Sequence, residues 1–154
     1  MTSKPAFDDI YMELAVNLAR RSHCIKRHVG AVLTRDTRII SIGYNGPPSG
    51  THNCDEEWPG AGCPRDSKGG CSLAIHAEQN AILKLATSNE SCEDSVLFLT
   101  HAPCMDCAKQ IYTAGIRRVF FDTQYRSMDG VVFLENCNIK VEQINGETKE
   151  DIII

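Results

Sequence analysis

Residues 96–122 read VLFLTHAPCMDCAKQIYTAGIRRVFFD, and this stretch decides the fold class. It opens with a short apolar run at 96–100 and closes with a second one at 118–122, and both are typical of buried strands. Between them the pattern predicts a helix over 104–114. That helix begins next to Pro103 and ends at Gly115, a residue favoured just after helix ends. Strand, helix and strand in succession indicate an α/β fold.

The flanking sequence extends this pattern in both directions. Apolar residues at three- and four-residue steps from Phe7 to Leu18 predict a helix. Two strands at 29–34 and 39–43, joined by a polar turn at 35–38, predict a hairpin. A helix over 76–85, a short helix near 129–135 and a strand near 139–143 complete the order. The sequence therefore predicts a three-layer α/β sandwich with a central mixed sheet of about five strands.

Length, charge and hydropathy bound the class of protein. The 154 residues fit one domain, 1–154, with an irregular cysteine-bearing excursion at 51–72. The net charge of −4 argues against a binder of long nucleic acid, which usually shows a basic face. No stretch approaches the roughly 20 apolar residues that cross a membrane, and no apolar signal core follows the N-terminus. We therefore expect a cytoplasmic protein without membrane contact.

Eight cysteines are many for a cytoplasmic chain of this size. Disulfides are rare in reducing compartments, so spaced cysteines indicate a metal site or a catalytic role. An exported disulfide-bonded protein is the alternative, and the lack of a signal segment argues against it.

Two short motifs carry the chemistry, His76-Ala77-Glu78 and Pro103-Cys104-Met105-Asp106-Cys107. Zinc prefers nitrogen and thiolate ligands in a tetrahedral arrangement, and a catalytic site keeps one position open for water. Cys104 and Cys107 lie three residues apart on a helix and so share one face. With His76 they supply three zinc ligands. Both motifs lie where a helix begins beside a strand end, the place where sites gather in α/β folds.

Glu78 follows His76 by two residues and is not needed as a ligand if water fills the fourth position. Zinc lowers the pKa of its bound water towards about 7, and a nearby carboxylate can then move the proton to a ring nitrogen and help an amino group leave. Such a general acid/base is worth about 10²–10⁴ in rate. A closed zinc site or two core cysteines are the alternatives. The combination of His-x-Glu with Pro-Cys-x-x-Cys is typical of zinc deaminases and favours the catalytic reading.

At these residues the chain resembles the cytidine/deoxycytidylate deaminase superfamily, over residues 7 to 143. Several further segments are similar to its deoxycytidylate branch: Val29-Gly30-Ala31, Gly43-Tyr44-Asn45-Gly46, residues 76–82 and Ala114-Gly115-Ile116. Deaminases of free nucleosides typically carry Cys in place of the ligand His. The tRNA adenosine deaminases share the His and the Cys spacing, but this chain is acidic and shows no basic arm for RNA.

The resemblance implies hydrolysis of dCMP to dUMP and ammonia, which supplies dUMP for thymidylate synthesis. It also implies that Asn45 binds the sugar or base, that Lys26 binds the phosphate, and that Tyr125 closes over the nucleotide. Backbone N–H groups near Ala77 and Cys104 are expected to orient the substrate. The residues alone leave simpler roles open: a solvated charge for Lys26, a packing ring for Tyr125 and a turn residue for Asn45.

Many relatives in this family are hexamers switched by dCTP and dTTP with magnesium. By this resemblance we expect a homohexameric allosteric enzyme in which Gly46, Pro47 and Gly50 bind the effector. The turn-rich backbone of residues 46–50 suits that role, because it can present N–H groups to phosphates.

Members of the family with a similar cysteine layout carry an additional zinc ion. The excursion at 51–72 has few apolar residues to hold it, and a metal would supply the missing stability. The expected ligands of this second zinc are Cys24, Cys54, Cys63 and Cys71. The alternative is that these are unligated, small buried residues, which is also our interpretation of Cys92 and Cys137.

Two other functions remain as alternatives at this point. One is a related deaminase that acts on another cytosine compound, such as dCTP, cytidine or cytosine, or on adenine in RNA. The other is a non-enzymatic zinc-binding module. Glu78 argues against the second, because a closed structural site has no use for a carboxylate there.

Overall fold

The computed structural model describes residues 3–58, 60 and 63–144, and its α-helices and strands follow the predicted order with one addition. In sequence they are α1 (Phe7–Ala19), β1 (Gly30–Arg35), β2 (Arg38–Tyr44), α2 (Cys54–Glu57), α3 (Ala77–Lys84), a 3₁₀ turn η1 (Leu85–Thr87), β3 (Val96–His101), α4 (Met105–Thr113), β4 (Arg118–Thr123), α5 (Asp129–Asn136) and β5 (Lys140–Gln143). The addition is α2, a single turn inside the excursion. Its four residues are too few for a periodic apolar pattern, so the sequence gives no sign of it.

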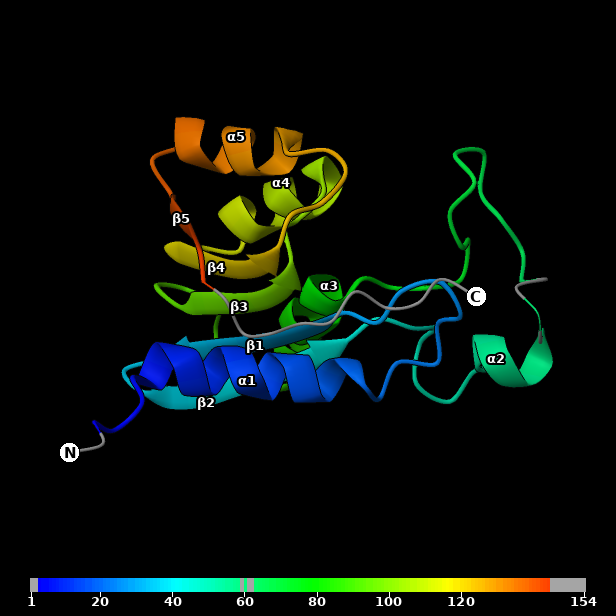
Figure 1. Ribbon diagram of the computed structural model, residues 1–154, viewed down its shortest axis with the longest axis horizontal. Helices are drawn as coiled ribbons and strands as arrows, with labels where there is room; N and C mark the ends of the chain where they lie inside the picture. The colour runs from blue at the N-terminus through cyan, green and yellow to red at the C-terminus, as the bar shows by residue number, and fades with distance from the viewer. Residues whose placement is uncertain (1–2, 59, 61–62, 145–154) are drawn as a thin grey trace.

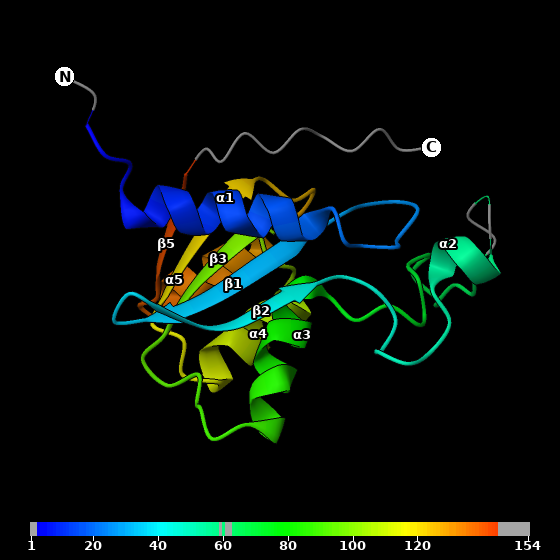
Figure 2. The ribbon, with the colours of Figure 1, turned by 90° about the horizontal axis from the view of Figure 1, so that it is seen from below.

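The strands form one mixed sheet in the order β2-β1-β3-β4-β5. β1 runs antiparallel to both β2 and β3, whereas β3, β4 and β5 are parallel to one another. α1 covers one face of the sheet, and α3, α4 and α5 cover the other (Figures 1 and 2). The predicted three-layer sandwich with a mixed five-stranded sheet is therefore confirmed.

Apolar side chains fill both layers between helices and sheet. Alternate residues of one strand point to opposite faces, so a strand covered on both sides reads as a continuous apolar run. On the central strand β3, Phe98 packs with Tyr11 and Met12 of α1. Its neighbours Leu97 and Leu99 pack on the other side, in the cluster that also holds residues of α3, α4 and α5. This two-sided burial fixes the helices that carry the two motifs against the sheet.

The β1–β2 hairpin turns over two residues, where the sequence analysis had assigned four to the turn. Asp36 and Thr37 both adopt the left-handed conformation, with φ of 51° and 65°, as a tight hairpin with the natural strand twist requires. Arg35 and Arg38 are paired as the last rungs of the strands. The Tyr11 hydroxyl of α1 donates a hydrogen bond to the Thr37 carbonyl at 2.7 Å, which ties the turn to the helix above it.

Two glycines permit the close approaches that place the motif helices. A Cβ at Gly43 of β2 would lie 2.4 Å from the Ala77 carbonyl oxygen, so only glycine lets the start of α3 approach this strand. A Cβ at Gly130 of α5 would lie 2.4 Å from the Pro103 carbonyl oxygen and 2.7 Å from that of Cys104. α5 therefore rests directly on the turn that carries the Pro-Cys-x-x-Cys motif.

The topology brings loops from four strands to one edge of the sheet. The C-terminal ends of the parallel strands β3 and β4 lie there. Because β1 is antiparallel to β3, its N-terminal end lies there too, together with the C-terminal end of β2. The excursion after β2, including α2, extends outward from this same edge (Figure 1). Within the described residues, no helix is both long and apolar enough to cross a membrane.

Candidate functional site

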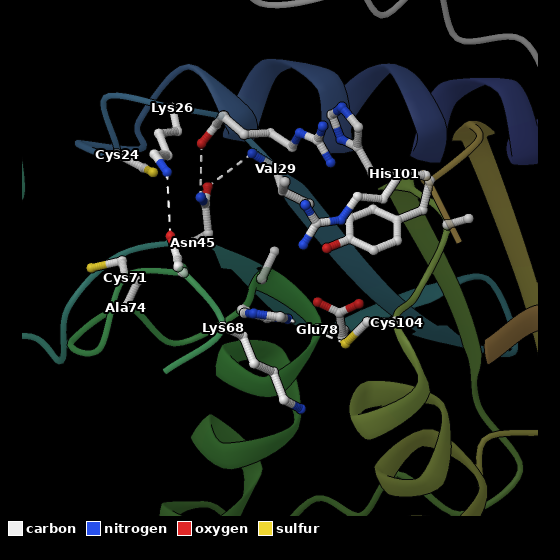
Figure 3. Close-up of a pocket in the computed structure, with 18 residues that line it drawn as sticks. Cys24, Lys26, Val29, Asn45, Lys68, Cys71, Ala74, Glu78, His101 and Cys104 are labelled. Carbon is white, nitrogen blue, oxygen red and sulfur yellow. Dashed lines mark hydrogen bonds between the residues drawn. The ribbon is translucent and has the colours of Figure 1, made fainter. Parts of the chain in front are cut away.

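A cavity of about 390 Å³ opens at this edge of the sheet (Figure 3). Its walls come from the segment before β1, the residue after β2, the end of the excursion, the start of α3, the turn before α4 and the loop after β4. A volume of this order suits a small organic ligand. Both sequence motifs contribute to its lining, through His76, Glu78 and Cys104.

The three predicted zinc ligands meet at the floor of this cavity. His76 caps the N-terminus of α3, and Cys104 caps that of α4, so each residue stands one position outside the helix that was predicted to include it. The Gln79 side chain accepts a hydrogen bond from the His76 backbone N–H at 2.9 Å and fixes this cap. One ligand atom from each of His76, Cys104 and Cys107 lies within 4.8 Å of the other two.

The donor chemistry of these residues fits a catalytic zinc ion. His76 Nδ1 lies 3.1 Å from Cys107 Sγ and 3.7 Å from Cys104 Sγ. One imidazole nitrogen and two sulfurs are ligands that zinc prefers, and three protein ligands leave a fourth position for water. His76 and Cys104 reach the cavity, whereas Cys107 is buried beneath them. A metal held here would therefore face the open space.

The two thiols share their protons unequally. The hydrogen bond from Cys107 lowers the pKa of the Cys104 thiol to about 4, and the same bond raises the pKa of Cys107. The hydrogen bond to Cys104 raises the pKa of the His76 imidazole. The cluster therefore stabilises a thiolate, the form of cysteine that binds metal.

Glu78 lies on the first turn of α3 with its side chain 4% exposed. Burial raises the pKa of its carboxyl group to about 7, against the opposing effect of nearby His76. A carboxyl with a pKa near neutrality can both accept and donate a proton at physiological pH. Figure 3 shows the carboxylate beside Cys104, at the centre of the cavity.

Four cationic side chains line the outer part of the cavity: Lys26, Arg27, Lys68 and Arg126. None of them pairs with a carboxylate in the part of the chain that the structure describes. By contrast, Arg35, Arg117 and Arg118 elsewhere on the surface each lie within 4.0 Å of an acidic group. Among the described lining residues, only Glu78 carries a carboxyl group. The cavity therefore offers a cationic rim to an anionic ligand.

Tyr125 connects this rim to the apolar core. Its ring packs against the cluster of Ala102, Phe121 and Val131, and it also lines the cavity. The guanidinium carbons of Arg27 and Arg126 lie 5.4 and 5.7 Å from the ring centroid. These distances suit cation–π contacts. The ring thus has the packing role that was one of the two expected for Tyr125, and it also lines the cavity in which the other, the contact with the nucleotide, would be made.

Asn45 is buried, and its side chain holds the segment before β1. Its Oδ1 accepts a hydrogen bond from the Val29 N–H, and its Nδ2 donates to the Arg27 carbonyl, both at 2.8 Å. One hydrogen of Nδ2 and one lone pair of Oδ1 stay available to a ligand. Ala77 also lines the cavity, as the first residue of α3. Asn45 thus shapes the wall that carries Lys26 and Arg27.

The predicted effector residues lie outside this cavity. Gly46 uses both of its backbone groups in a bridge to Ile75, with N–H···O distances of 3.1 and 2.8 Å. Its N–H is therefore not available to a phosphate in this conformation. Pro47 has no N–H, and Gly50 is exposed with φ of 88°.

Three of the four cysteines expected at a second site come together. Cys54, Cys63 and Cys71 each place a sulfur within 4.8 Å of the other two. Burial raises the pKa of the Cys54 thiol to about 12, and the neighbouring thiols of Cys71, Cys63 and Cys24 add to this effect. Cys24 is therefore near the cluster, although it is not within that 4.8 Å set. These sulfur atoms are suitable ligands for a structural zinc ion, because structural zinc sites are typically closed sites made of cysteine thiolates.

Burial also raises the pKa of the Cys63 thiol. Burial opposes ionisation of Cys71 as well, but backbone N–H groups of Leu73 and Ala74 lower its pKa. One thiol of the cluster is thus prepared to ionise first, which is the step that metal binding requires.

Lys68, His101 and Arg126 are among the lining residues to which the sequence assigned no role in this cavity. Arg126 directly follows Tyr125, so its proximity to the predicted ring was the one sign available. His101 is buried, and its Nδ1 lies 2.9 Å from the Thr100 hydroxyl. Lys68 reaches the cavity only because the excursion folds back towards the sheet, which no local pattern reveals.

Comparison with known proteins gives a consistent result. Residues 5–123 match the family model for the cytidine and deoxycytidylate deaminase zinc-binding region. The deoxycytidylate deaminase of Mycobacterium phage D29 is 34% identical over 131 residues, which are 77% of this chain and 96% of that protein. The deoxycytidylate deaminase of Schizosaccharomyces pombe is 39% identical over 129 residues, 79% of this chain but 38% of that protein. This chain therefore spans well under half the length of the fission-yeast relative.

A solved structure shares the fold closely. The dCMP deaminase of cyanophage S-TIM5, in complex with dCMP and dUMP, superposes with a TM-score of 0.79 at 36% identity. The match covers 93% of this chain and all of that one.

Proposed function

The chain belongs to the cytidine and deoxycytidylate deaminase family, with a zinc-binding region, and from that premise we propose that it hydrolyses dCMP to dUMP and ammonia. One observation carries the proposal: the buried carboxyl group of Glu78 and the His76–Cys104–Cys107 triad share a cavity with a cationic rim. Residues 1–154 would act as one deaminase domain, and the dUMP that it releases would supply thymidylate synthesis. The deaminase structure with dCMP and dUMP bound supports the choice of substrate.

The residues at the floor of the cavity can carry out the reaction. When bound by His76, Cys104 and Cys107, zinc supplies the Lewis acidity that makes a water molecule nucleophilic near neutral pH. The Glu78 carboxylate accepts the proton that this water loses and passes it to N3 of the cytosine ring as oxygen adds at C4. A second transfer through Glu78, from the added hydroxyl to the amino nitrogen, releases ammonia and leaves a carbonyl at C4. The near-neutral pKa of Glu78 suits both directions of transfer.

The walls supply recognition. The 5′-phosphate of the nucleotide would lie among Lys26, Arg27, Lys68 and Arg126, which lack carboxylate partners among the described residues. Asn45 would offer its second Nδ2 hydrogen to the sugar or base, and Tyr125 would close over the nucleotide. The Ala77 N–H would orient the ring. An unphosphorylated nucleoside would leave the four cations without a partner, which favours the nucleotide as substrate.

A second zinc ion would bind the thiol cluster of Cys54, Cys63 and Cys71, with Cys24 completing the set. The sulfur donors and the irregular excursion that they connect support this assignment. Metal analysis of the purified protein tests it directly. A count of one zinc ion per chain would contradict it.

We extend the proposal to assembly and regulation on the basis of the family resemblance. A cytoplasmic homohexamer, switched by dCTP or dTTP with magnesium at Gly46, Pro47 and Gly50, would be the regulated form. Because the Gly46 N–H is bonded to Ile75, binding of an effector phosphate to that group would require the Gly46–Ile75 bridge to open. Exposed apolar side chains on α3, α4 and α5, among them Leu83, Tyr112 and Val132, support association. Light scattering with and without dCTP and magnesium tests this part, and a monomer under all conditions would contradict it.

The deciding experiment measures ammonia release from a panel of substrates: dCMP, CMP, dCTP, deoxycytidine and cytosine. Turnover preferring dCMP is the expected result. Equal turnover of deoxycytidine would contradict the role of the cationic rim. No turnover of any compound, with zinc bound and the fold intact, would overturn the proposal and leave a modified base, an adenine in RNA or a non-enzymatic role.

A further inference from the structure

Two wall segments of the cavity end at the thiol cluster, one in its member Cys71 and the other in the neighbouring Cys24. The first runs from Cys24 to Arg27 and carries Lys26; the second runs from Lys68 to Cys71. Figure 3 shows Cys24, Lys26 and Cys71 on the same flank of the cavity, away from Cys104. Cys24 and Cys71 themselves line this flank. The cluster and the cationic rim are therefore two sides of one wall.

Among the described residues, one hydrogen bond connects the two segments. Lys26 Nζ donates a hydrogen bond to the Gly69 carbonyl at 3.4 Å, and Lys26 is exposed. An exposed bond of this length contributes little stability on its own. A second hydrogen bond nearby is also exposed: His23 Nδ1 lies 2.9 Å from Asp55 Oδ1 of α2. These exposed hydrogen bonds thus hold the two segments to each other only weakly.

The second segment nevertheless has hydrogen bonds of its own that define its shape. The Asp66 carboxylate accepts hydrogen bonds from the N–H groups of Lys68 and Gly70, both at 2.9 Å, which closes a tight turn. The Arg65–Cys71 bridge joins the two arms of that turn. The turn is therefore a small unit whose position relative to Cys24–Arg27 depends on what connects the two.

We propose that the four-cysteine cluster is a positioning device for the cationic rim, so that a metal bound to Cys24, Cys54, Cys63 and Cys71 sets the affinity for the phosphate of the nucleotide. This inference rests on the function and second zinc site proposed above. The metal connects the two segments at their cysteine ends and brings Lys26 and Lys68 to the same side of the cavity. Without it, the Lys68–Cys71 segment moves relative to the Cys24–Arg27 segment, which Asn45 holds on the sheet, and the binding-competent arrangement becomes a minor population. Affinity then falls by the fraction of molecules that retain it.

Loss of the metal is expected to weaken binding of the phosphate of the nucleotide and to leave the reacting centre unchanged. The triad and Glu78 are held by α3, α4 and the sheet, through contacts that do not involve the excursion. A loss of the second metal should therefore raise KM for dCMP much more than it lowers kcat. A general loosening of the fold would instead reduce kcat and the thermal stability together.

The test compares full-length wild-type protein with Cys54→Ser, which removes one ligand that does not line the cavity. Zinc content, Trp58 fluorescence and the Kd of dUMP and of deoxyuridine are measured for each. Trp58 caps α2 through a hydrogen bond from its N–H to the Cys54 carbonyl at 2.9 Å, so it reports on the cluster. The variant should lose the second zinc ion and bind dUMP about tenfold more weakly, the value of one charged hydrogen bond, while the Kd of deoxyuridine changes by less than about twofold.

Two further variants keep the result interpretable. Cys137→Ser, at a half-buried cysteine at the end of α5, is the matched control and should retain both zinc ions and the wild-type Kd. If Cys54→Ser does not fold, Cys63→Ser replaces it, because Cys63 belongs to the same cluster and does not line the cavity either. Combining the cysteine change with Lys68→Met should give less than the product of the two effects on dUMP binding, because both act through the same contact.

The outcomes separate this inference from the function on which it rests. A wild-type protein that fails to release ammonia from dCMP overturns the proposed function. An active wild-type protein with a single zinc ion overturns the inference alone. So does a Cys54→Ser variant that loses its second zinc ion and keeps the wild-type Kd for dUMP.

Discussion

The Nδ1 of His76 lies 3.1 Å from the Sγ of Cys107, although 31 positions separate them in the chain. This distance joins the start of α3 to the first turn of α4. It is the contact through which the two motifs become one ligand set.

Replacing Cys107 with Ser should abolish zinc binding at this set. Serine offers a weaker oxygen ligand in place of the buried sulfur. Activity is expected to fall by more than about 100-fold, because mutating a residue that only hydrogen-bonds to a metal ligand already costs up to about that much. Zinc content and ammonia release are measured together. Cys92→Ser is the control, since Cys92 is also buried but belongs to none of the ligand groups; a parallel loss there would point to general unfolding.

Glu78→Gln should reduce kcat by about 10²–10⁴-fold, because the amide keeps the shape of the side chain but cannot accept or return a proton. Zinc content and melting temperature should stay at wild-type values. The same substitution at Glu13, an exposed residue of α1, controls for the chemical change. Turnover by Glu78→Gln near the wild-type rate would rule out the proton-transfer role.

Arg126→Ala should raise KM for dCMP about tenfold, the value of one charge-assisted hydrogen bond. Steady-state kinetics with dCMP and deoxycytidine measure the effect as a change in the ratio of kcat/KM between the two. Arg117→Ala is the matched control: Arg117 is exposed, pairs with Asp94 at the opposite edge of the sheet and should leave the ratio unchanged. Equal ratios for Arg126→Ala and wild type would remove Arg126 from the rim.

Gly130→Ala should destabilise the protein by about 1–3 kcal/mol, since the added methyl group meets the carbonyls of Pro103 and Cys104. Because those carbonyls belong to the ligand turn, zinc affinity should fall as well. Thermal unfolding and zinc titration measure the two effects. Gly46→Ala, where an added Cβ meets nothing within 4 Å, should change stability by less than about 0.5 kcal/mol.

The sequence was sufficient for the order of the elements along the chain and for bringing His76, Cys104 and Cys107 together, because both depend on local periodicity. Apolar runs identify strands, and the spacing of Cys104 and Cys107 is set by one helical turn. The rim could not be predicted in the same way. Lys68 and Arg126 lie in loops. They come close together only because the excursion folds back to the sheet, and no short sequence pattern predicts that path. Asn45 shows the intermediate case, since its pocket location was expected but its bonds to the backbone of Arg27 and Val29 were not.

The cationic rim has a consequence for how fast the site fills. A chain with a net charge of −4 repels a dianion at long range, but four cations gathered at one opening create a local field of opposite sign. Incoming nucleotide is then guided over the last stretch of its diffusion, on the scale of the Debye length of roughly 10 Å at 0.1 M salt. The second-order rate of capture should fall as ionic strength rises for a phosphorylated ligand and stay constant for a neutral nucleoside, so salt would act on encounter and leave the chemistry at Glu78 unchanged.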